Sequence, residues 1–131
     1  NKYINNGLIE YLGTTDNVQK YIKESDCVLL PSYREGMPKS LLEASAIGRP
    51  IIASDVPGCK HLINDGENGF LCKAKDSKHL TEIILKFLSL NINERKNMGI
   101  KAYNKVYKNF NENSVIDRYI SILSDLNRIY K

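Results

Sequence analysis

Two glutamates flank a stretch that could bind a phosphorylated, hydroxyl-rich ligand. Glu35 lies just before a segment of helical character and Glu43 lies within it, with seven residues between them. Carboxylates are poor neighbours for phosphate, but they accept paired hydrogen bonds from vicinal hydroxyls such as those of a ribose or a hexose. The helix start between them would offer unpaired N–H groups and the positive end of its dipole to an anion. The pair therefore predicts a site for a nucleotide diphosphate sugar.

A buried strand is expected shortly before Glu35. Residues 27–30 form a short apolar run, partly β-branched, that suits a strand buried on both faces. Pro31 ends this strand because proline has no N–H group to donate to a neighbouring strand.

The helix that would carry Glu43 has a defined beginning and end. Pro38 fits the first helical position, and Gly48 followed by Pro50 closes the helix. Residues 51–53 read as the next strand, and residues 55–58 as the loop that follows it. Strand and helix alternate here, which favours a parallel α/β sheet with both loops meeting at one edge.

Each glutamate also has an ordinary structural interpretation. Ser40 and Glu43 match the S-x-x-E capping box, in which Glu43 would satisfy only a backbone N–H group. The position of Pro38 favours an earlier helix start, but the capping alternative stays open. Glu35 alone could be a solvated loop acid, and strand–loop–helix units are common in domains that bind nothing there.

The stretch E-G-M-P-K-S-L-L-E-A resembles the E-x7-E signature of the retaining, nucleotide-sugar-dependent glycosyltransferases of family 4, also called group 1. With the helical tail, the resemblance covers nearly the whole chain. The further motifs that carry it are I-E-Y-L-G at residues 9–13, P-S-Y at 31–33, A-x-G-R-P-I-I-A-S-D-V-P-G at 46–58 and N-D-G-E-N-G-F-L at 64–71.

The resemblance implies half of a GT-B enzyme, in which two Rossmann-like domains face each other across a cleft. Residues 1–131 would form the carboxyl-terminal, nucleotide-sugar-binding domain, incomplete at its N-terminal side and without the acceptor domain. The expected fold is α/β, a Rossmann-like three-layer parallel sheet with helices on both faces and a helical C-terminal tail. The chain alone should bind a donor weakly and transfer nothing.

The resemblance also assigns roles to individual residues. Glu35, the expected catalytic residue, would take the hydroxyls of the donor sugar, and Glu43 those of the ribose. Thr14 falls where such enzymes let the backbone meet the base. No metal is implied, because the helix dipole and basic side chains would neutralise the leaving diphosphate. The expected substrate-binding residues are Thr14, Glu35, Gly36, Met37, Lys39, Ser40, Leu41 and Glu43.

The implied activity is that of a retaining hexosyltransferase. A UDP- or GDP-hexose would be the donor, and a glycan or lipid-linked molecule the acceptor, as in bacterial polysaccharide synthesis. A GT-B nucleotide-sugar epimerase, a phosphorylase and a non-catalytic nucleotide-sugar-binding domain remain alternatives. The base, the hexose and the acceptor are not specified by the sequence.

Composition agrees with one globular domain and argues against a nucleic-acid partner. The chain has 131 residues, 42% hydrophobic and 26% charged, with a formal net charge of +4. Basic residues are scattered through the last third, which favours a solvated helix face over a nucleic-acid stripe. The expected location is the cytoplasm. Weak attraction to anionic lipids leaves peripheral contact at the inner face of the membrane open.

Three cysteines without C-x-x-C spacing favour reduced thiols and argue against a zinc site. His61 stands where many relatives carry a glutamate and is expected to be an exposed structural histidine. His79 has no partner identifiable in the sequence and is expected to cap or to face solvent.

The remaining elements are predicted from local patterns. Strands are expected at 8–12 and 70–72. Helices are expected from 18, at 60–63, over 80–88 with Asp76 or Ser77 as cap, at 94–109 and at 114–130. The buried stripe expected on the last helix consists of Val115, Tyr119, Ile122, Leu123 and Leu126.

Overall fold

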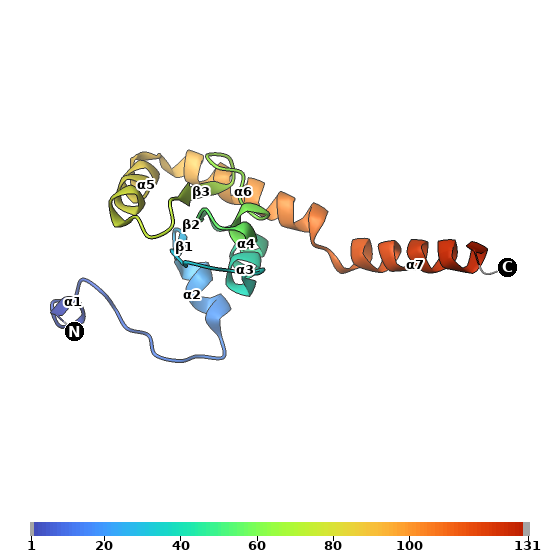
Figure 1. Cartoon of the computed structure of the whole chain (residues 1–131). Helices are drawn as coiled ribbons and strands as arrows, with labels where there is room; N and C mark the ends of the chain where they lie inside the picture. Colours follow the sequence, from blue (N-terminus) through green and yellow to red (C-terminus); the bar gives the residue numbers. More distant parts are fainter. Residues whose placement is uncertain (1, 130–131) are drawn as a thin grey trace.

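The computed structural model of the chain describes residues 2–129 (Figure 1). Three parallel strands form one sheet in the order β1-β2-β3. The strands are β1 (Val28–Leu30), β2 (Ile51–Ser54) and β3 (Gly69–Cys72), and the helices are α1 (Lys2–Asn5), α2 (Val18–Glu24), α3 (Lys39–Ile47), α4 (Pro57–Lys60), α5 (Ser77–Ser89), α6 (Ile92–Asn109) and α7 (Glu112–Ile129).

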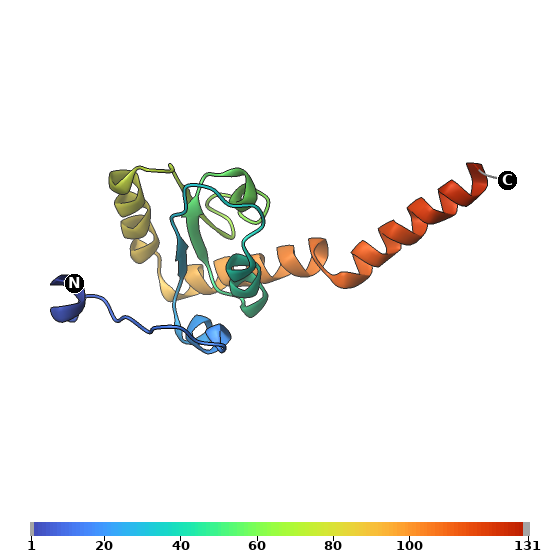
Figure 2. The ribbon, with the colours of Figure 1, turned by 60° about the horizontal axis from the view of Figure 1, so that its bottom comes forward.

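Side chains of the central strand alternate between two apolar cores, one on each face of the sheet. Ile51 packs with Leu41 of α3 on one face, whereas Ile52 packs with Ile83 and Phe87 of α5 on the other. All four residues of β2 are buried. Helices cover both faces, so the predicted three-layer α/β architecture is confirmed (Figure 2).

Helix α6 crosses the end of the sheet at which the strands begin (Figure 2). Its Met98 belongs to the core under α5, and its Val106 packs against the core under α3. Gly99 lets α6 approach the end of α3, because a methyl carbon placed on Gly99 would lie 2.0 Å from the carbonyl oxygen of Gly48. Gly48 itself has φ +79°, the left-handed conformation expected of a helix-terminating glycine.

The outer strand is less buried than its sequence predicts. Leu29 in the middle of β1 is 44% exposed, because among the described residues β1 has a neighbour only on its β2 side. The prediction of a strand buried on both faces at residues 27–30 is therefore wrong. Cys27, just before the strand, is half-buried.

The strand predicted at residues 8–12 is also wrong. The segment has no regular secondary structure, and Leu8 and Tyr11 are 73% and 75% exposed. It lies apart from the described sheet (Figure 1). A strand needs a neighbour to satisfy its backbone groups, and no described strand lies beside this segment.

Two helix starts differ from prediction because of prolines. Pro38 is the N-cap of α3, with φ −71° and ψ 115°, so the first helical residue is Lys39. Pro57 occupies the first turn of α4, where its fixed φ suits a helix. The short helix therefore spans Pro57–Lys60 and not residues 60–63.

The last helix runs away from the body of the molecule (Figures 1 and 2). Tyr119, Ile122 and Leu123, predicted to be buried, are 66%, 50% and 59% exposed. Val115 and Leu126 of that prediction lie outside the described side chains, and Tyr130, the predicted end of the helix, lies outside the described residues. Among the described residues, no helix is both long and apolar enough to cross a membrane.

We expect Gly99→Ala to lower the free energy of unfolding by about 1–3 kcal/mol, because the new methyl group would collide with the backbone of Gly48. Helix propensity alone predicts the opposite sign, since alanine is favoured over glycine within a helix. Urea denaturation measures the effect. Asn97→Ala, at an exposed position of the same helix, is the matched control and should change stability by less than about 0.5 kcal/mol. A stabilised Gly99→Ala variant would contradict the contact.

Candidate functional site

The loops that follow β1 and β2 are in direct contact at the carboxyl edge of the sheet. A methyl carbon placed on Gly58 would lie 1.8 Å from the carbonyl oxygen of Gly36 and 2.6 Å from that of Glu35. Only a glycine permits this approach of the two backbones. The prediction that two loops meet at this edge is confirmed, and the contact fixes the position of the loop that carries Glu35.

Helix α3 begins at this edge with unpaired backbone donors. The N–H groups of Lys39 and Ser40 have no acceptor among the described residues, whereas Leu41 N donates to Pro38 O at 3.1 Å. No side chain caps the helix, because its N-cap is the buried Pro38. The helix start therefore presents free donors and the positive end of its dipole to the space above the sheet edge.

Glu43 is not engaged in a capping box. It is the fifth residue of α3, and the structure shows no side-chain hydrogen bond at the helix start. Its carboxylate lies 3.6 Å from Lys39 Nζ, and the two side chains are 24% and 89% exposed. An ion pair this exposed contributes less than about 1 kcal/mol, so Glu43 is free to exchange its partner.

Glu35 is half-buried beside the helix that follows β2. Burial raises the pKa of the Cys59 thiol, and the nearby Glu35 carboxylate raises it further because a thiolate would be repelled. Cys59 is fully buried in the core under α3. The predicted acid thus projects from a loop that rests on a packed element.

The other predicted site residues divide into three groups. Gly36 and Met37 are exposed in the loop, next to the free amides of α3. Leu41 is fully buried, so its side chain serves the core. Thr14 is exposed in the segment before α2, which lies at the end of the sheet where the strands begin (Figure 2). The structure does not bring Thr14 to the loop, and its contact with a base stays a prediction.

Two lysines that the sequence reasoning missed lie at the same edge. Lys73 directly follows β3, and Lys75 Nζ lies 5.5 Å from the centre of the Tyr33 ring. They line a hollow of about 340 Å³ that also includes the ends of β2 and β3. Ligands of open parallel sheets bind beyond the carboxyl ends of the strands, so the position of Lys73 after a predicted strand was a readable signal.

A second hollow, of about 460 Å³, lies on the other side of Lys73 and includes Asp55 and Lys60. Asp55 Oδ1 and Lys60 Nζ are 3.0 Å apart. His79 also lines it, and its Nδ1 accepts a hydrogen bond of 2.9 Å from the backbone N–H of Lys73. The prediction that His79 has no partner is wrong, because a contact across six residues of a turn is not visible in sequence.

His61 and the cysteines offer no further chemistry. His61 is exposed at the end of α4, as predicted. The three cysteines are free, and burial raises the pKa of Cys27 to about 12, so that thiol stays protonated at neutral pH. Within the part of the chain that the structure describes, no group of three histidine, cysteine or acidic residues could hold a metal ion.

Sequence comparisons agree on one family. The family model described as "Glycosyl transferases group 1" matches residues 1–105. One relative, from Campylobacter jejuni, is 33% identical over 92% of this chain and 32% of its own length. It is named N,N'-diacetylbacillosaminyl-diphospho-undecaprenol alpha-1,3-N-acetylgalactosaminyltransferase. Another, from Escherichia coli, is 30% identical over 88% of this chain and 29% of its own length. It is named UDP-Gal:alpha-D-GlcNAc-diphosphoundecaprenol alpha-1,3-galactosyltransferase.

Solved structures share the fold. The chain superposes with a TM-score of 0.84 on Anabaena Alr3699/HepE in complex with UDP, at 22% identity over 95% of this chain and 35% of that one. It superposes equally on the sucrose-phosphate synthase of Thermosynechococcus elongatus, at 23% identity over 98% of this chain and 32% of that one. These likenesses confirm the predicted GT-B half-fold.

We expect Gly58→Ala to destabilise the protein by about 1–3 kcal/mol and to displace the loop at Glu35, because its methyl group would overlap the carbonyl oxygen of Gly36. Thermal and urea denaturation measure the stability. Gly36→Ala is the matched control: the same change in the partner loop meets no atom within 4 Å, so its stability should stay within about 0.5 kcal/mol of wild type. Equal stabilities of the two variants would show that the loops do not touch as described.

Proposed function

The chain belongs to the group 1 glycosyltransferases, and on that premise we propose that it supplies the donor-binding half of a retaining hexosyltransferase. The donor would be a UDP- or GDP-hexose, and the acceptor a glycan or lipid-linked molecule. The chain spans about a third of the length of the curated relatives it matches. The acceptor domain, the complete reaction and the inactivity of this chain alone are therefore parts of the proposal.

One observation carries the proposal: α3 begins at the carboxyl edge of a parallel sheet with free amides, and along the chain these amides fall between Glu35 and Glu43. Amides and a helix dipole suit the negative diphosphate. Glu35 and Glu43 suit the hydroxyls of a sugar and a ribose. A site with acids alone, or amides alone, would fit only half of such a donor.

The proposed reaction depends mainly on stabilising the negative charge of the leaving diphosphate. As the sugar–phosphate bond breaks, negative charge grows on the departing β-phosphate. Backbone donors at Met37, Lys39 and Ser40 would meet that charge, and one such preorganised donor is worth roughly a hundredfold or more in rate. Pro38 has no N–H group and cannot contribute.

Glu35 is proposed to orient the reacting sugar. The sugar must be held so that the reacting bond lies along the direction of attack, and orientation of this kind is a large part of enzymatic rate enhancement. The contact of its loop with Gly58 gives Glu35 a fixed backbone from which to do so. Hydroxyl binding by Glu35 would then affect turnover more than ground-state affinity.

Lysines at the same edge support metal-independent neutralisation of the diphosphate. Lys73 and Lys75 line the hollow beside the strand ends, whereas Lys60 in the neighbouring hollow is already paired with Asp55. The positive field of Lys73 and Lys75 would attract an anionic donor from solution. In this proposal the helix dipole and lysines do the work that a bound cation does at other diphosphate sites.

The names of relatives support a role in bacterial polysaccharide synthesis. Two relatives carry diphospho-undecaprenol acceptors in their names, and another is named an amylovoran biosynthesis glycosyltransferase from Erwinia amylovora. We propose a lipid-linked acceptor and a cytoplasmic location for the whole protein, where nucleotide sugars would reach it. Incubating the intact protein with a sugar-labelled donor and analysing the products tests transfer: a labelled epimer, or a bound donor that stays intact, would contradict it.

We expect Glu43→Ala to weaken the affinity for UDP or GDP by roughly tenfold, because two hydrogen bonds from ribose hydroxyls to a carboxylate would be lost. Isothermal titration calorimetry on the intact protein measures the affinity. Glu82→Ala, which removes an exposed acid of α5, controls for the change in net charge. An unchanged affinity in Glu43→Ala would exclude a ribose contact.

We expect Glu35→Ala to lower kcat at least about a hundredfold while the nucleotide affinity changes less than about threefold, since Glu35 is assigned to the sugar and not to the nucleotide. Steady-state transfer assays combined with calorimetry separate the two effects. Glu82→Ala again serves as control. Parallel losses of kcat and nucleotide affinity would argue against this division of roles.

A further inference from the structure

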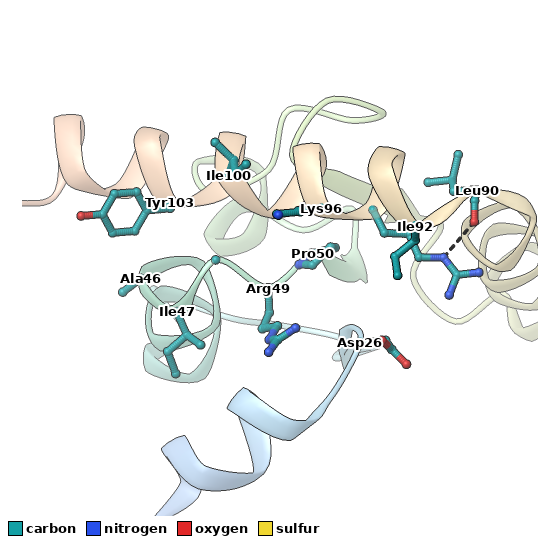
Figure 3. A pocket seen from close by; sticks show the side chains of 12 residues that line it. Asp26, Ala46, Ile47, Arg49, Pro50, Leu90, Ile92, Lys96, Ile100 and Tyr103 are labelled. Carbon is teal, nitrogen blue, oxygen red and sulfur yellow. Dashed lines mark hydrogen bonds between the residues drawn. The ribbon is translucent and has the colours of Figure 1, made fainter.

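A larger hollow lies at the opposite end of the sheet, where the strands begin. Its volume is about 870 Å³, and it lies between the end of α3 and one side of α6. Figure 3 shows Ile92, Ile100 and Tyr103 along α6, with Ile47 and Arg49 on the facing side. The donor site proposed above contains none of these residues, so the hollow needs its own explanation.

The wall formed by α6 is part of a longer exposed stripe. At about 100° per residue, five side chains of this helix fall within about 80° of its circumference and extend over roughly 22 Å. They are Ile92, Lys96, Ile100, Tyr103 and Tyr107, here called the α6 stripe. Both isoleucines and both tyrosines are exposed, from 44% at Tyr103 to 80% at Ile92.

Packing among the described residues does not account for the α6 stripe. The buried side of the helix consists of Met98, Gly99 and Ala102, which lie on a different arc. The rings of Tyr103 and Tyr107 stack on each other, with centroids 5.9 Å apart, and remain open to solvent on the surface. A contiguous apolar surface of this kind on a soluble domain marks an interaction site.

Charge indicates the chemistry of the partner. Helix α6 carries five basic residues and one acid, Glu94. Arg95 and Lys105 are engaged in hydrogen bonds within the chain. Lys96, Lys101 and Lys108 have neither a hydrogen bond nor an ion pair with any described residue, and Lys96 lies within the α6 stripe. The hollow adds one acid, Asp26, and one base, Arg49, so the surface combines exposed isoleucine and tyrosine with a net positive charge.

We propose that the α6 stripe and the adjoining hollow dock on the surface of an anionic lipid bilayer. Isoleucine and tyrosine side chains suit the boundary between headgroups and acyl chains, where a tyrosine hydroxyl stays hydrated. Lys96 would meet lipid phosphates within the stripe. Lys101 and Lys108 lie about 120–140° round the helix from the centre of the stripe, on the side turned away from the bilayer, and add only longer-range attraction.

A second copy of the chain fits this surface less well. A symmetric pair would place the same patch on itself and bring the two sets of unpaired lysines together, and like charges across an interface oppose association. A lipid surface supplies the opposite charge. The inference goes beyond the proposed transfer reaction, and its surface lies at the other end of the sheet from the donor site.

Vesicle sedimentation of the intact protein tests this docking. At 0.15 M salt, we expect binding to vesicles of phosphatidylcholine with 30% phosphatidylglycerol to exceed binding to phosphatidylcholine alone by about fivefold or more. The double variant Ile100→Ser/Tyr103→Ser should bind the anionic vesicles about tenfold more weakly. Lys96→Glu should lose at least about fivefold. Both variants change exposed side chains, and circular dichroism verifies folding.

The matched control removes one aliphatic and one tyrosine side chain elsewhere on the surface. Leu85→Ser/Tyr11→Ser changes residues that are 61% and 75% exposed, and its vesicle binding should stay within about twofold of wild type. Equal binding to both vesicle types, or wild-type binding by Ile100→Ser/Tyr103→Ser, would overturn the proposal. A dimer in solution that this variant abolishes would assign the stripe to self-association instead. Nucleotide affinity, measured on the same variants, keeps this test separate from that of the donor site.

Discussion

The candidate site depends on how closely one backbone approaches another at the carboxyl edge of the sheet. Gly58 lies against the carbonyl oxygens of Glu35 and Gly36, where no side chain could fit. At the other end of α3, Gly99 lies against Gly48 in the same manner. The helix is therefore held near both ends by backbone contacts, which leave little freedom to move its free amides relative to β2. Such rigidity is what a binding site for a charged ligand requires, because donors that need no reorganisation stabilise charge most effectively.

The groups at this edge are weakly paired with one another, which suits them to a ligand. The N–H groups of Lys39 and Ser40 have no described acceptor, and Glu43 is held only by an exposed lysine. Binding a donor would replace contacts of small free energy with hydrogen bonds to phosphate and hydroxyls. In contrast, the fully buried Cys59 and Leu41 secure the surrounding elements. Buried residues thus stabilise this region, while its less buried polar groups stay available to a ligand.

Local structure could be predicted from the sequence wherever residues close in the chain determine it. Gly48 ends α3 in the expected left-handed conformation, and Asp76 caps α5 as one of the two predicted candidates. The meeting of two loops at one edge followed from the topology of parallel strands. The capping box of Asn91 and Glu94 was equally readable as N-x-x-E, and its omission placed the start of α6 two residues late.

Features that depend on distant or absent partners could not be read in this way. The apolar pattern at residues 8–12 is that of a strand, but a pattern does not supply the neighbouring strand that pairing requires. The exposed Tyr119 and Leu123 show the same limit for a helix: periodicity identifies an apolar face without identifying what covers it. His79 and Lys73 come together only because β3 and α5 pack side by side.

The separation of the two surfaces along the strands has a mechanical consequence. The proposed donor site faces the ends of the strands, whereas the α6 stripe lies near their beginnings, so bilayer contact at one end would not obstruct the other. Helix α6 joins the two roles, because its Gly99 packs on the end of the same α3 whose start presents the free amides. A protein docked through α6 would therefore hold its donor site at a fixed orientation to the membrane. A lipid-linked acceptor is itself confined to the membrane, so an enzyme resting on the same surface would meet it at a raised effective concentration without any new contact to the acceptor itself.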